Sequence, residues 1–462
     1  MDERQVRGKL NKPTSSGKDE WGEYDIIPLS MLAGGKLESY KVYRKPCRHV
    51  HQKGCPAPRG WYKDKHTPPN QRPRPCYTEA LLTTPYAGFC PVNCAMCYVN
   101  GGTRGYRATG IASVHPEYPD KMRKQIAKMQ ICPNAYISSY IEPFHVMEQK
   151  YHITQRLTQI FLDENVPIFY LSRLIPPDWA KDALLQNPYS YMQWSINTGD
   201  PDQYHKMSPG SYDLDEVYRE ISDYHSAGIY VSIQVNPIMA GITSLEDITN
   251  LFCSLAQAGA NHVIVKFCEQ VASNRKSLIE RMHVGKLPRV DEFDNLFTQV
   301  IGGVYTIRED IRLKWLRYLL SLSRDLGLTM STCYEYVDDG TQGGTSIGPF
   351  FTTSDQCHGR GVPMFYRPEP GMKFQPLPGC YRKGCLYCED YGTKCCGNSL
   401  LLQAKALKYS DYQAVRLVGD ESNWDLEDSC SEPDYAVDDY IHNAMGNPGL
   451  MTDAEMWGWS LE

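Results

Sequence analysis

The stretch "GFCPVNCAMCYVNGG", residues 88–102, places three thiols in one short loop, at Cys90, Cys94 and Cys97. It follows "ALLTTPYA", an apolar run typical of a strand. A structural zinc site closes with four protein ligands, whereas three thiolates suit a cubane iron–sulfur cluster with one iron left open. The stretch therefore predicts a [4Fe-4S] cluster held by these three cysteines, in a loop that leaves a strand.

Beyond this loop, short apolar runs alternate with helical patterns. The runs are "NAYISSYI", "VPIFYLSRL", "YMQWSIN", "IYVSIQVNPI", "NHVIVKF" and "LTMSTCYEY". Between two of them, "SLEDITNLFCSLAQAGA" (244–260) has a capping-box pattern from Ser244 to Asp247 and stops at Gly259. Nearly continuous apolar strands separated by helices favour a parallel sheet that is covered by helices.

The sequence thus predicts an α/β protein: a partial (β/α)6-type TIM barrel with an irregular N-terminal segment and a C-terminal cysteine-rich extension. A doubly wound open sheet is the alternative. The expected domains are a basic irregular segment (1–77), the barrel (78–336), a cysteine-rich auxiliary region (337–400) and an acidic tail (401–462). Residues 269–309 are expected to add helices. A barrel carries its catalytic groups at the carboxyl ends of its strands, where the cysteine loop falls.

The net charge of -6 hides opposite charges at the two ends of the chain. Residues 1–75 hold sixteen Lys and Arg against eight acids, whereas 409–462 hold thirteen acids against Arg416 alone. A basic segment suits a polyanion, although two solvated ends explain the pattern equally well. No apolar run approaches the roughly 18 residues of a membrane span, and no signal peptide is evident, so a cytoplasmic location is expected. Seventeen cysteines then indicate metal ligands more than disulfides.

The cysteine loop resembles that of the radical S-adenosylmethionine (SAM) superfamily, marked by Cys-x3-Cys-x2-Cys with an aromatic residue before the last cysteine. Here Met96 stands at that place and Tyr98 follows the last cysteine, a variant similar to the spore photoproduct lyase group. The resemblance covers about residues 80–270, including "ISSYIEPFHVMEQKY", "FYLSRL", "WSINTGD" and "VSIQVNPIMAGI". It implies that the open iron binds SAM, whose reductive cleavage gives a 5′-deoxyadenosyl radical.

The same resemblance implies which residues hold the methionine and ribose parts of SAM. They are Ser138, Ser139, Arg173, Ser195 and Asn197, with Gln234 and Asn236 nearby. Hydroxyls, amides and one cation suit a buried zwitterion and ribose, because unpaired buried polar groups cost about 1–3 kcal/mol. Spore photoproduct lyase returns hydrogen through a cysteine where Ser139 and Tyr140 stand here, so Cys132 or Tyr98 is the expected substitute.

A second cysteine group follows the barrel, in "GCYRKGCLYCEDYGTKCC". An auxiliary [4Fe-4S] cluster, favoured by the resemblance, would take Cys333, Cys357, Cys385 and Cys388, with Cys380 competing for a place. A structural zinc site is the alternative.

The lyase-like core and basic aromatic segments such as "YKVYRKPCRHVHQK" point to a nucleic-acid substrate, because Lys and Arg pair with phosphates and aromatic rings stack on bases. We therefore expect hydrogen abstraction from thymine or a modified thymine, in DNA or a nucleotide, to repair, rearrange or hypermodify it. An electron donor such as flavodoxin or ferredoxin is implied. The alternatives are radical modification of a peptide or small metabolite, and a non-catalytic redox sensor, which an open iron would serve poorly.

Overall fold

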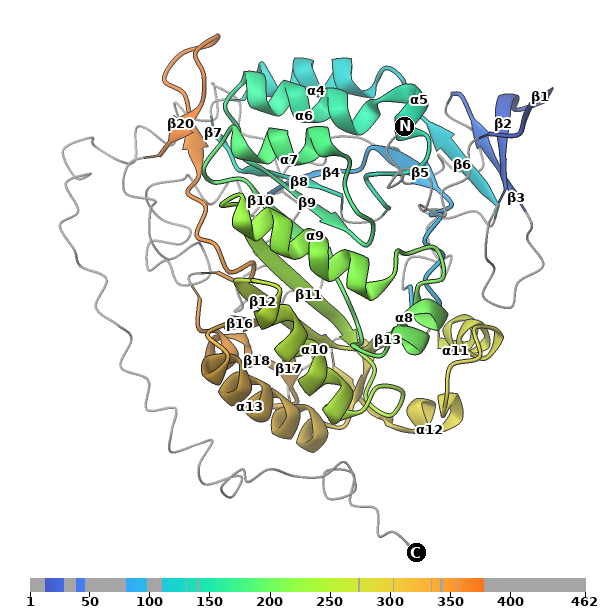
Figure 1. Ribbon diagram of the computed structural model, residues 1–462, viewed down its shortest axis with the longest axis vertical. Coiled ribbons are helices and arrows are strands. Elements are labelled where there is room, and N and C mark those ends of the chain that lie inside the picture. The colour runs from blue at the N-terminus through green and yellow to red at the C-terminus, as the bar shows by residue number, and fades with distance from the viewer. Residues whose placement is uncertain are drawn as a thin grey trace, which may run out of the picture.

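A sheet of seven parallel strands forms the centre of the molecule (Figure 1). The computed structural model describes residues 13–28, 39–45, 80–97, 110–129, 131–138, 141–272, 275–301, 303–333, 335–340, 344–354 and 356–377. The seven strands are β4 (Ala80–Thr83), β8 (Asn134–Ile137), β9 (Ile168–Ser172), β10 (Tyr191–Ser195), β11 (Tyr230–Ile238), β12 (His262–Phe267) and β16 (Thr329–Thr332). Every apolar run predicted as a strand of this sheet is therefore confirmed.

The order of the strands makes this sheet a partial barrel, as predicted, with one strand more than the six expected. Chain order and sheet order agree from β4 to β16, and all pairings are parallel. A doubly wound sheet reverses its strand order at a switch point, so that alternative is wrong. Within the described residues, β4 and β16 form two separate edges.

Helices between the strands cover the outer face of the sheet (Figure 1). They are α4 (Tyr118–Ile126), α5 (Glu148–Tyr151), α6 (Ile153–Asp163), α7 (Asp178–Leu185), α8 (Pro201–Met207), α9 (Leu214–Ser226), α10 (Leu245–Gln257) and α13 (Glu309–Asp325). Alternate strand residues face them: Trp194 of β10 packs on Tyr224 of α9, and Phe267 of β12 packs on Trp315 of α13. The residues between these point into the barrel, because side chains alternate along a strand.

Local sequence signals set where these helices begin and end. The Ser244 hydroxyl accepts a hydrogen bond from the Asp247 N–H at 3.0 Å and caps α10, as predicted. Gly228 and Gly259, with φ of +81° and +88°, follow α9 and α10 in the left-handed region, where a glycine lacks the Cβ penalty. The chain therefore turns directly into β11 and β12.

The expectation of an irregular N-terminal segment is wrong over its described part. A second sheet contains β1 (Ser15–Asp19), β2 (Gly22–Pro28), β3 (Ser39–Tyr43), β6 (Ile111–Val114) and β5 (Tyr86–Gly88), in that order. Alternation in "GEYDIIP" buries Asp25 and Ile27 on one face, the pattern of a half-buried strand. The segment rich in proline, 55–75, lies outside the described residues. Because β5 leads into the cysteine loop, this sheet helps to position it.

A buried carboxylate joins the N-terminal sheet to the barrel. Asp25 accepts hydrogen bonds from Arg44, Lys150 and Ser16, each at 2.8 Å, and Lys150 belongs to α5. Burial raises the pKa of Asp25, but the hydrogen bonds from these residues outweigh burial and hold the pKa below its usual value. The two sheets are thus tied by charge as well as by apolar packing.

Residues 269–309 form more than the expected helices. Besides α11 (Arg275–Val284) and α12 (Val290–Asn295), a small antiparallel sheet contains β13 (Glu269–Val271), β15 (Val304–Ile307) and β14 (Phe297–Ile301). The sequences "FTQVI" and "VYTI" are rich in β-branched residues and flank Gly303, whose φ of +82° suits a tight turn. These signals span only four or five residues each, and the longer helical pattern of α11 masks them in the sequence.

Aromatic rings fill the inside of the barrel at the amino ends of the strands. Phe169 stacks on Tyr136 and Tyr191, with ring centroids 4.4 and 4.6 Å apart, and the Tyr191 hydroxyl bonds His358 at 2.8 Å. The later short elements are β17 (Tyr336–Val337), β18 (Thr345–Ser346), the 3-10 helix η2 (Gly348–Phe351), β19 (Phe365–Tyr366) and β20 (Gln375–Pro376), with β19 pairing to β7 (Ile131–Cys132). Space for chemistry is therefore at the carboxyl ends of the strands. None of the described helices is both long and apolar enough to cross a membrane.

Candidate active site at the carboxyl ends of the strands

The cysteine loop is a pair of tight turns packed between other loops. The Asn93 N–H donates to the Cys90 carbonyl at 3.1 Å, and the Cys97 N–H donates to the Cys94 carbonyl at 3.2 Å. Asn93 has a φ of +50°, a conformation that asparagine tolerates better than most residues. These turns keep the three predicted ligands within one short segment, where Cys90 is buried and the other two are partly exposed.

The end of α8 and the loop after it bind the cysteine loop through backbone hydrogen bonds. The Ala95 N–H donates to the Met207 carbonyl at 2.9 Å, and the Gly210 N–H donates to the Val92 carbonyl at 3.1 Å. A Cβ on Gly210 would lie 2.2 Å from the Pro91 carbonyl oxygen, closer than two such atoms can approach. Glycine is therefore required at this position by the close passage of the two loops.

The inserted residues support the other side of the loop. Arg281 of α11 donates to the Cys97 carbonyl at 2.9 Å, and a Cβ on Gly285 would lie 3.3 Å from the Ala95 side chain. The cysteine loop thus depends on two segments that lie more than a hundred residues further along the chain.

In the part of the chain that the structure describes, no three His, Cys, Asp or Glu side chains converge on a single metal ion. This does not conflict with a cubane cluster, because each of its three thiolates binds a different iron atom. The donor set, three thiols from one loop and no fourth among its neighbours in sequence, fits a cluster with an open iron.

Arg173 brings a positive charge to the cysteine loop. Its guanidinium donates to the Ser195 carbonyl at 3.1 Å and to the Ser208 hydroxyl at 3.3 Å, and that hydroxyl donates to the Cys94 sulfur at 3.5 Å. Burial raises the pKa of the Cys94 thiol, and the charge of Arg173 opposes this effect. The predicted cofactor residue Arg173 therefore lies beside a predicted cluster ligand.

The other predicted cofactor residues line the inside of neighbouring strand ends. Ser195 ends β10 and pairs with Gln234 of β11, and Ser138 follows β8 directly. Asn236 lies two residues beyond Gln234, so the two side chains share the inner face. The structure thus brings residues from three strands together at the carboxyl ends of the strands. Ser139 and Tyr98 lie outside the described residues.

Asn197 points to a ligand at the carboxyl ends of the strands. Its amide nitrogen donates to the Pro237 carbonyl at 3.0 Å, whereas its side-chain oxygen is buried and has no hydrogen-bond partner among the described residues. An unpaired buried acceptor costs about 1–3 kcal/mol, so a bound donor such as a ribose hydroxyl would relieve it. This arrangement fits the cofactor role predicted for Asn197.

Cys132 is misplaced for the hydrogen transfer expected of it. It lies in β7, ahead of the amino end of β8, and pairs with Phe365. Ser138, six positions further along the chain, lies at the opposite end of β8, roughly 20 Å away along an extended chain. Its thiol is fully buried and donates to the Pro133 carbonyl at 3.3 Å. The expectation for Cys132 is wrong because Cys132, although close to Ser138 in sequence, lies at the amino ends of the strands, opposite the cysteine loop.

Glu142 is a site residue that sequence reasoning missed. Its buried carboxylate accepts hydrogen bonds from the Ser172 hydroxyl at 2.6 Å, the Phe144 N–H at 3.2 Å and the Arg173 N–H at 3.1 Å. Burial raises its pKa to about 7, against the effect of these hydrogen bonds. The lone acid between Ile141 and Pro143 was the available signal. Glu142 therefore fixes the end of β9, from which Arg173 extends.

The structure describes two of the predicted auxiliary ligands. The Cys357 carbonyl accepts a hydrogen bond from the Ser331 hydroxyl at 2.6 Å, and Cys333 lies two residues beyond Ser331 at the end of β16. Both cysteines therefore lie beside the same strand. Cys380, Cys385 and Cys388 lie outside the described residues.

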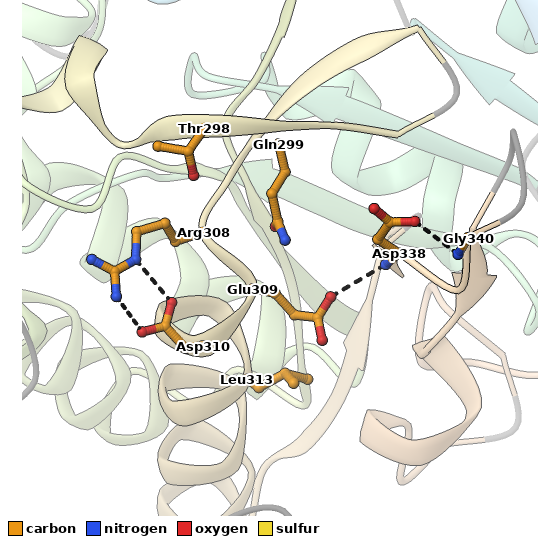
Figure 2. Close-up of a pocket in the computed structure, with 8 residues that line it drawn as sticks. All are labelled: Thr298, Gln299, Arg308, Glu309, Asp310, Leu313, Asp338 and Gly340. Atoms are coloured by element: carbon orange, nitrogen blue, oxygen red, sulfur yellow. Dashed lines mark hydrogen bonds and ion pairs between the residues drawn. The ribbon is translucent and has the colours of Figure 1, made fainter.

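A shallow pocket lies apart from these residues, between β14, the start of α13 and the turn after β17 (Figure 2). Its charged groups are engaged with neighbours: Arg308 pairs with Asp310 at 2.7 Å, and Glu309 accepts from the Asp338 N–H at 3.2 Å. We assign no chemistry to this pocket.

A partial parallel barrel with a Cys-x3-Cys-x2-Cys loop at the carboxyl ends of its strands defines a radical SAM enzyme. No family model matches the chain. A "Radical SAM Nalpha-GlyT isomerase" of Pseudomonas phage M6 is 43% identical over 376 residues, which cover 79% of this chain and 78% of that protein. The chain therefore belongs to the radical SAM enzymes and is a homologue of an isomerase.

Solved structures are less similar. A mutant of spore photoproduct lyase aligns with a TM-score of 0.41 and 16% identity, over 54% of this chain and 74% of the lyase. Streptococcus suis SuiB aligns with a TM-score of 0.36 and 11% identity, over 56% of this chain and 49% of SuiB. Likenesses this weak carry no inference about activity.

Proposed function

We propose that this protein is a radical SAM isomerase that rearranges a thymine base carrying a glycine attached through its α-nitrogen, in DNA or a nucleotide. The observation that carries the proposal is the 43% identity to the phage isomerase across most of both chains. A rearranged thymine was among the substrates expected from the sequence. The identity favours it over a peptide or a small metabolite.

The residues described above fit a cluster and SAM. Cys90, Cys94 and Cys97 would hold the cluster, and Arg173 would pair with the SAM carboxylate beside it. Ser138, Ser139, Ser195, Asn197, Gln234 and Asn236 are the proposed partners of the remaining polar groups of SAM. When bound, the cluster and SAM supply a 5′-deoxyadenosyl radical that can remove a hydrogen atom from the substrate.

An isomerisation conserves every atom, so the hydrogen removed at the start must be returned at the end. Cys132 lies at the amino ends of the strands, too far from the cysteine loop for this task. Tyr98, which follows Cys97 directly, remains the proposed donor from this chain. Its phenol would give a hydrogen atom to the rearranged substrate radical and would recover one from the 5′-methyl group of 5′-deoxyadenosine, so that the hydrogen count closes.

DNA binding is proposed from the basic N-terminal segment. Lys41 pairs with Asp19 at 3.1 Å and Arg44 pairs with Asp25 at 2.8 Å, so these two cations stabilise the N-terminal sheet. Phosphate contacts would therefore fall to the other cations of residues 1–77.

An auxiliary cluster, an electron donor such as flavodoxin or ferredoxin and a cytoplasmic location complete the proposal. The auxiliary ligands would come from Cys333, Cys357, Cys380, Cys385 and Cys388. Iron analysis of a variant with Cys385 and Cys388 changed to serine tests the auxiliary cluster, since it should lose iron without losing SAM cleavage.

The function is tested with anaerobically reconstituted, reduced protein, SAM and an oligonucleotide that contains Nα-glycyl-thymine. The expected product has an unchanged mass and a new fragmentation pattern in tandem mass spectrometry, because the glycine is rejoined through another atom. An oligonucleotide with ordinary thymine is the control and should stay unchanged. Formation of 5′-deoxyadenosine without any isomer would refute the proposed substrate.

A further inference from the structure

An ion pair lies at the carboxyl end of β12 and has no part in the site described so far. The Lys266 ammonium is 2.5 Å from the Glu269 carboxylate, and their side chains are only 10% and 23% exposed. Withdrawing two charges from water costs several kcal/mol per ion before their attraction is counted, so such pairs add little stability compared with apolar residues. The pair is therefore better suited to a role other than stability.

The strand register places Lys266 on the inner face of the barrel. His262, at the start of β12, bonds Ser331 across the inside of the sheet, and residues of β12 two apart share a face. Lys266, four residues beyond His262, therefore shares that face, whereas Phe267 faces α13. The ammonium thus starts from the same face as the proposed SAM residues.

The neighbouring strand ends bring Lys266 close to those residues. β10, β11 and β12 are adjacent, and adjacent strands lie about 4.8 Å apart. The register of β11 against β12 shifts between Val235 and Ile238, so Asn236 and Pro237 lie opposite Lys266. Pro237 in turn binds Asn197. Lys266 is thus one strand away from Asn236 and two from Ser195.

Thr306 adds an independent sign that a ligand belongs beside this pair. It is the register partner of Glu269 across β13 and β15, so the two side chains share a face. The Thr306 hydroxyl is buried, with 6% of the residue exposed, and has no hydrogen-bond partner among the described residues. A ligand with polar groups at Glu269 would supply that partner.

We propose that Lys266 and Glu269 recognise the glycyl group of the substrate, an inference that rests on the proposed function. A glycine joined through its nitrogen presents a carboxylate and a secondary ammonium a few ångströms apart. Lys266 would bind the carboxylate, Glu269 would bind the ammonium, and the Thr306 hydroxyl would serve as a further partner. The pair thus selects thymine that carries an amino acid over ordinary thymine.

A charge-swapped pair separates recognition from a merely structural role. The Lys266→Glu, Glu269→Lys double variant keeps an ion pair at this position but reverses its polarity. We expect it to melt near the wild-type temperature and to hold as much iron per chain as the wild type, because neither residue is a proposed cluster ligand. Its Kd and KM for the glycyl-thymine nucleotide should rise about 10- to 100-fold, the range for a lost charge-assisted hydrogen bond.

The ligand is varied in parallel, with a glycinamide analogue that lacks the carboxylate charge. The wild type and Lys266→Arg should bind the carboxylate form better than the amide by calorimetry, and the swapped variant should lose this preference. Arg275→Gln is the matched control, because it breaks another ion pair of the insertion, Arg275–Asp294 at 2.8 Å, and should keep the preference.

Two failures remain distinguishable. If the wild type isomerises the substrate but the swapped variant keeps the preference for the carboxylate, the ion pair is only structural and this inference is wrong. If the wild type neither binds nor converts glycyl-thymine, the proposed function fails, and the recognition role fails with it.

Discussion

Gly210→Ala should disable the cysteine loop without touching any proposed ligand. The added Cβ would lie 2.2 Å from the Pro91 carbonyl oxygen and 2.7 Å from the Val92 Cα, whereas real Cβ contacts almost never fall below 3.0 Å. The two loops must therefore separate by about 1 Å, a distance fixed by van der Waals contact. That shift strains the backbone hydrogen bonds of 2.9 and 3.1 Å that join the loops, near Ala95 and Gly210.

Losing two backbone hydrogen bonds lowers the free energy of unfolding by about 1–3 kcal/mol. Misplacing a reacting group by about 1 Å lowers a rate roughly 100-fold. The assay is the initial rate of 5′-deoxyadenosine formation by chromatography, with saturating SAM and reductant, together with iron per chain and the melting temperature.

Gly228→Ala is the control, because its φ of +81° is unfavourable for alanine but no atom lies within 4 Å of the new Cβ. It should lose about 1–2 kcal/mol of stability from the left-handed backbone and keep the wild-type rate. If Gly210→Ala binds full iron and cleaves SAM at the wild-type rate, the loop contact does not position the cluster.

Three further predictions concern the ligands and the buried carboxylates. Cys94→Ala should abolish 5′-deoxyadenosine formation and lower the iron content, as measured after anaerobic reconstitution; surviving cleavage would contradict the cluster assignment. Asp25→Asn should lower the free energy of unfolding by about 1–3 kcal/mol at pH 7, because Arg44 and Lys150 lose their partner. Since the pKa of Asp25 is lowered by folding, the difference in urea denaturation should shrink as the pH falls below 4. Burial raises the pKa of Glu142 from 4.5 to about 7, so the folded protein holds a proton that the unfolded chain releases. Stability should therefore decline between pH 4.5 and 7, by about 3 kcal/mol for this group, and Glu142→Gln should flatten that slope; an unchanged slope would refute the assignment.

Local patterns predicted the parallel sheet well because each signal is contained in a few residues. Apolar runs separated by amphipathic helices predicted all seven strands, and the Ser244 cap is present in the structure as expected. The N-terminal strands were missed because charge and proline dominated the composition of residues 1–77, while the alternation of "GEYDIIP" spans a single short strand. The small sheet of residues 269–307 was hidden beside a longer helical pattern.

The site was predictable only in part, because spatial neighbours can be distant in sequence. Cys132 and Ser138 are six residues apart yet lie at opposite ends of β8, while Arg173 and Cys94 are joined through Ser208. Glu142 showed no motif, and its importance follows from burial, which is a property of the folded chain.

The sequence by itself determined the chemistry, since three thiols at fixed spacing offer a cluster ligands whatever surrounds them. Only the tertiary structure decided which polar groups meet at that cluster, and that Lys266 stands on the same inner face as Ser195 and Asn236. The physical reason is that ligand spacing is a local covalent property, whereas burial, register and unpaired polar atoms arise from contacts between distant parts of the chain.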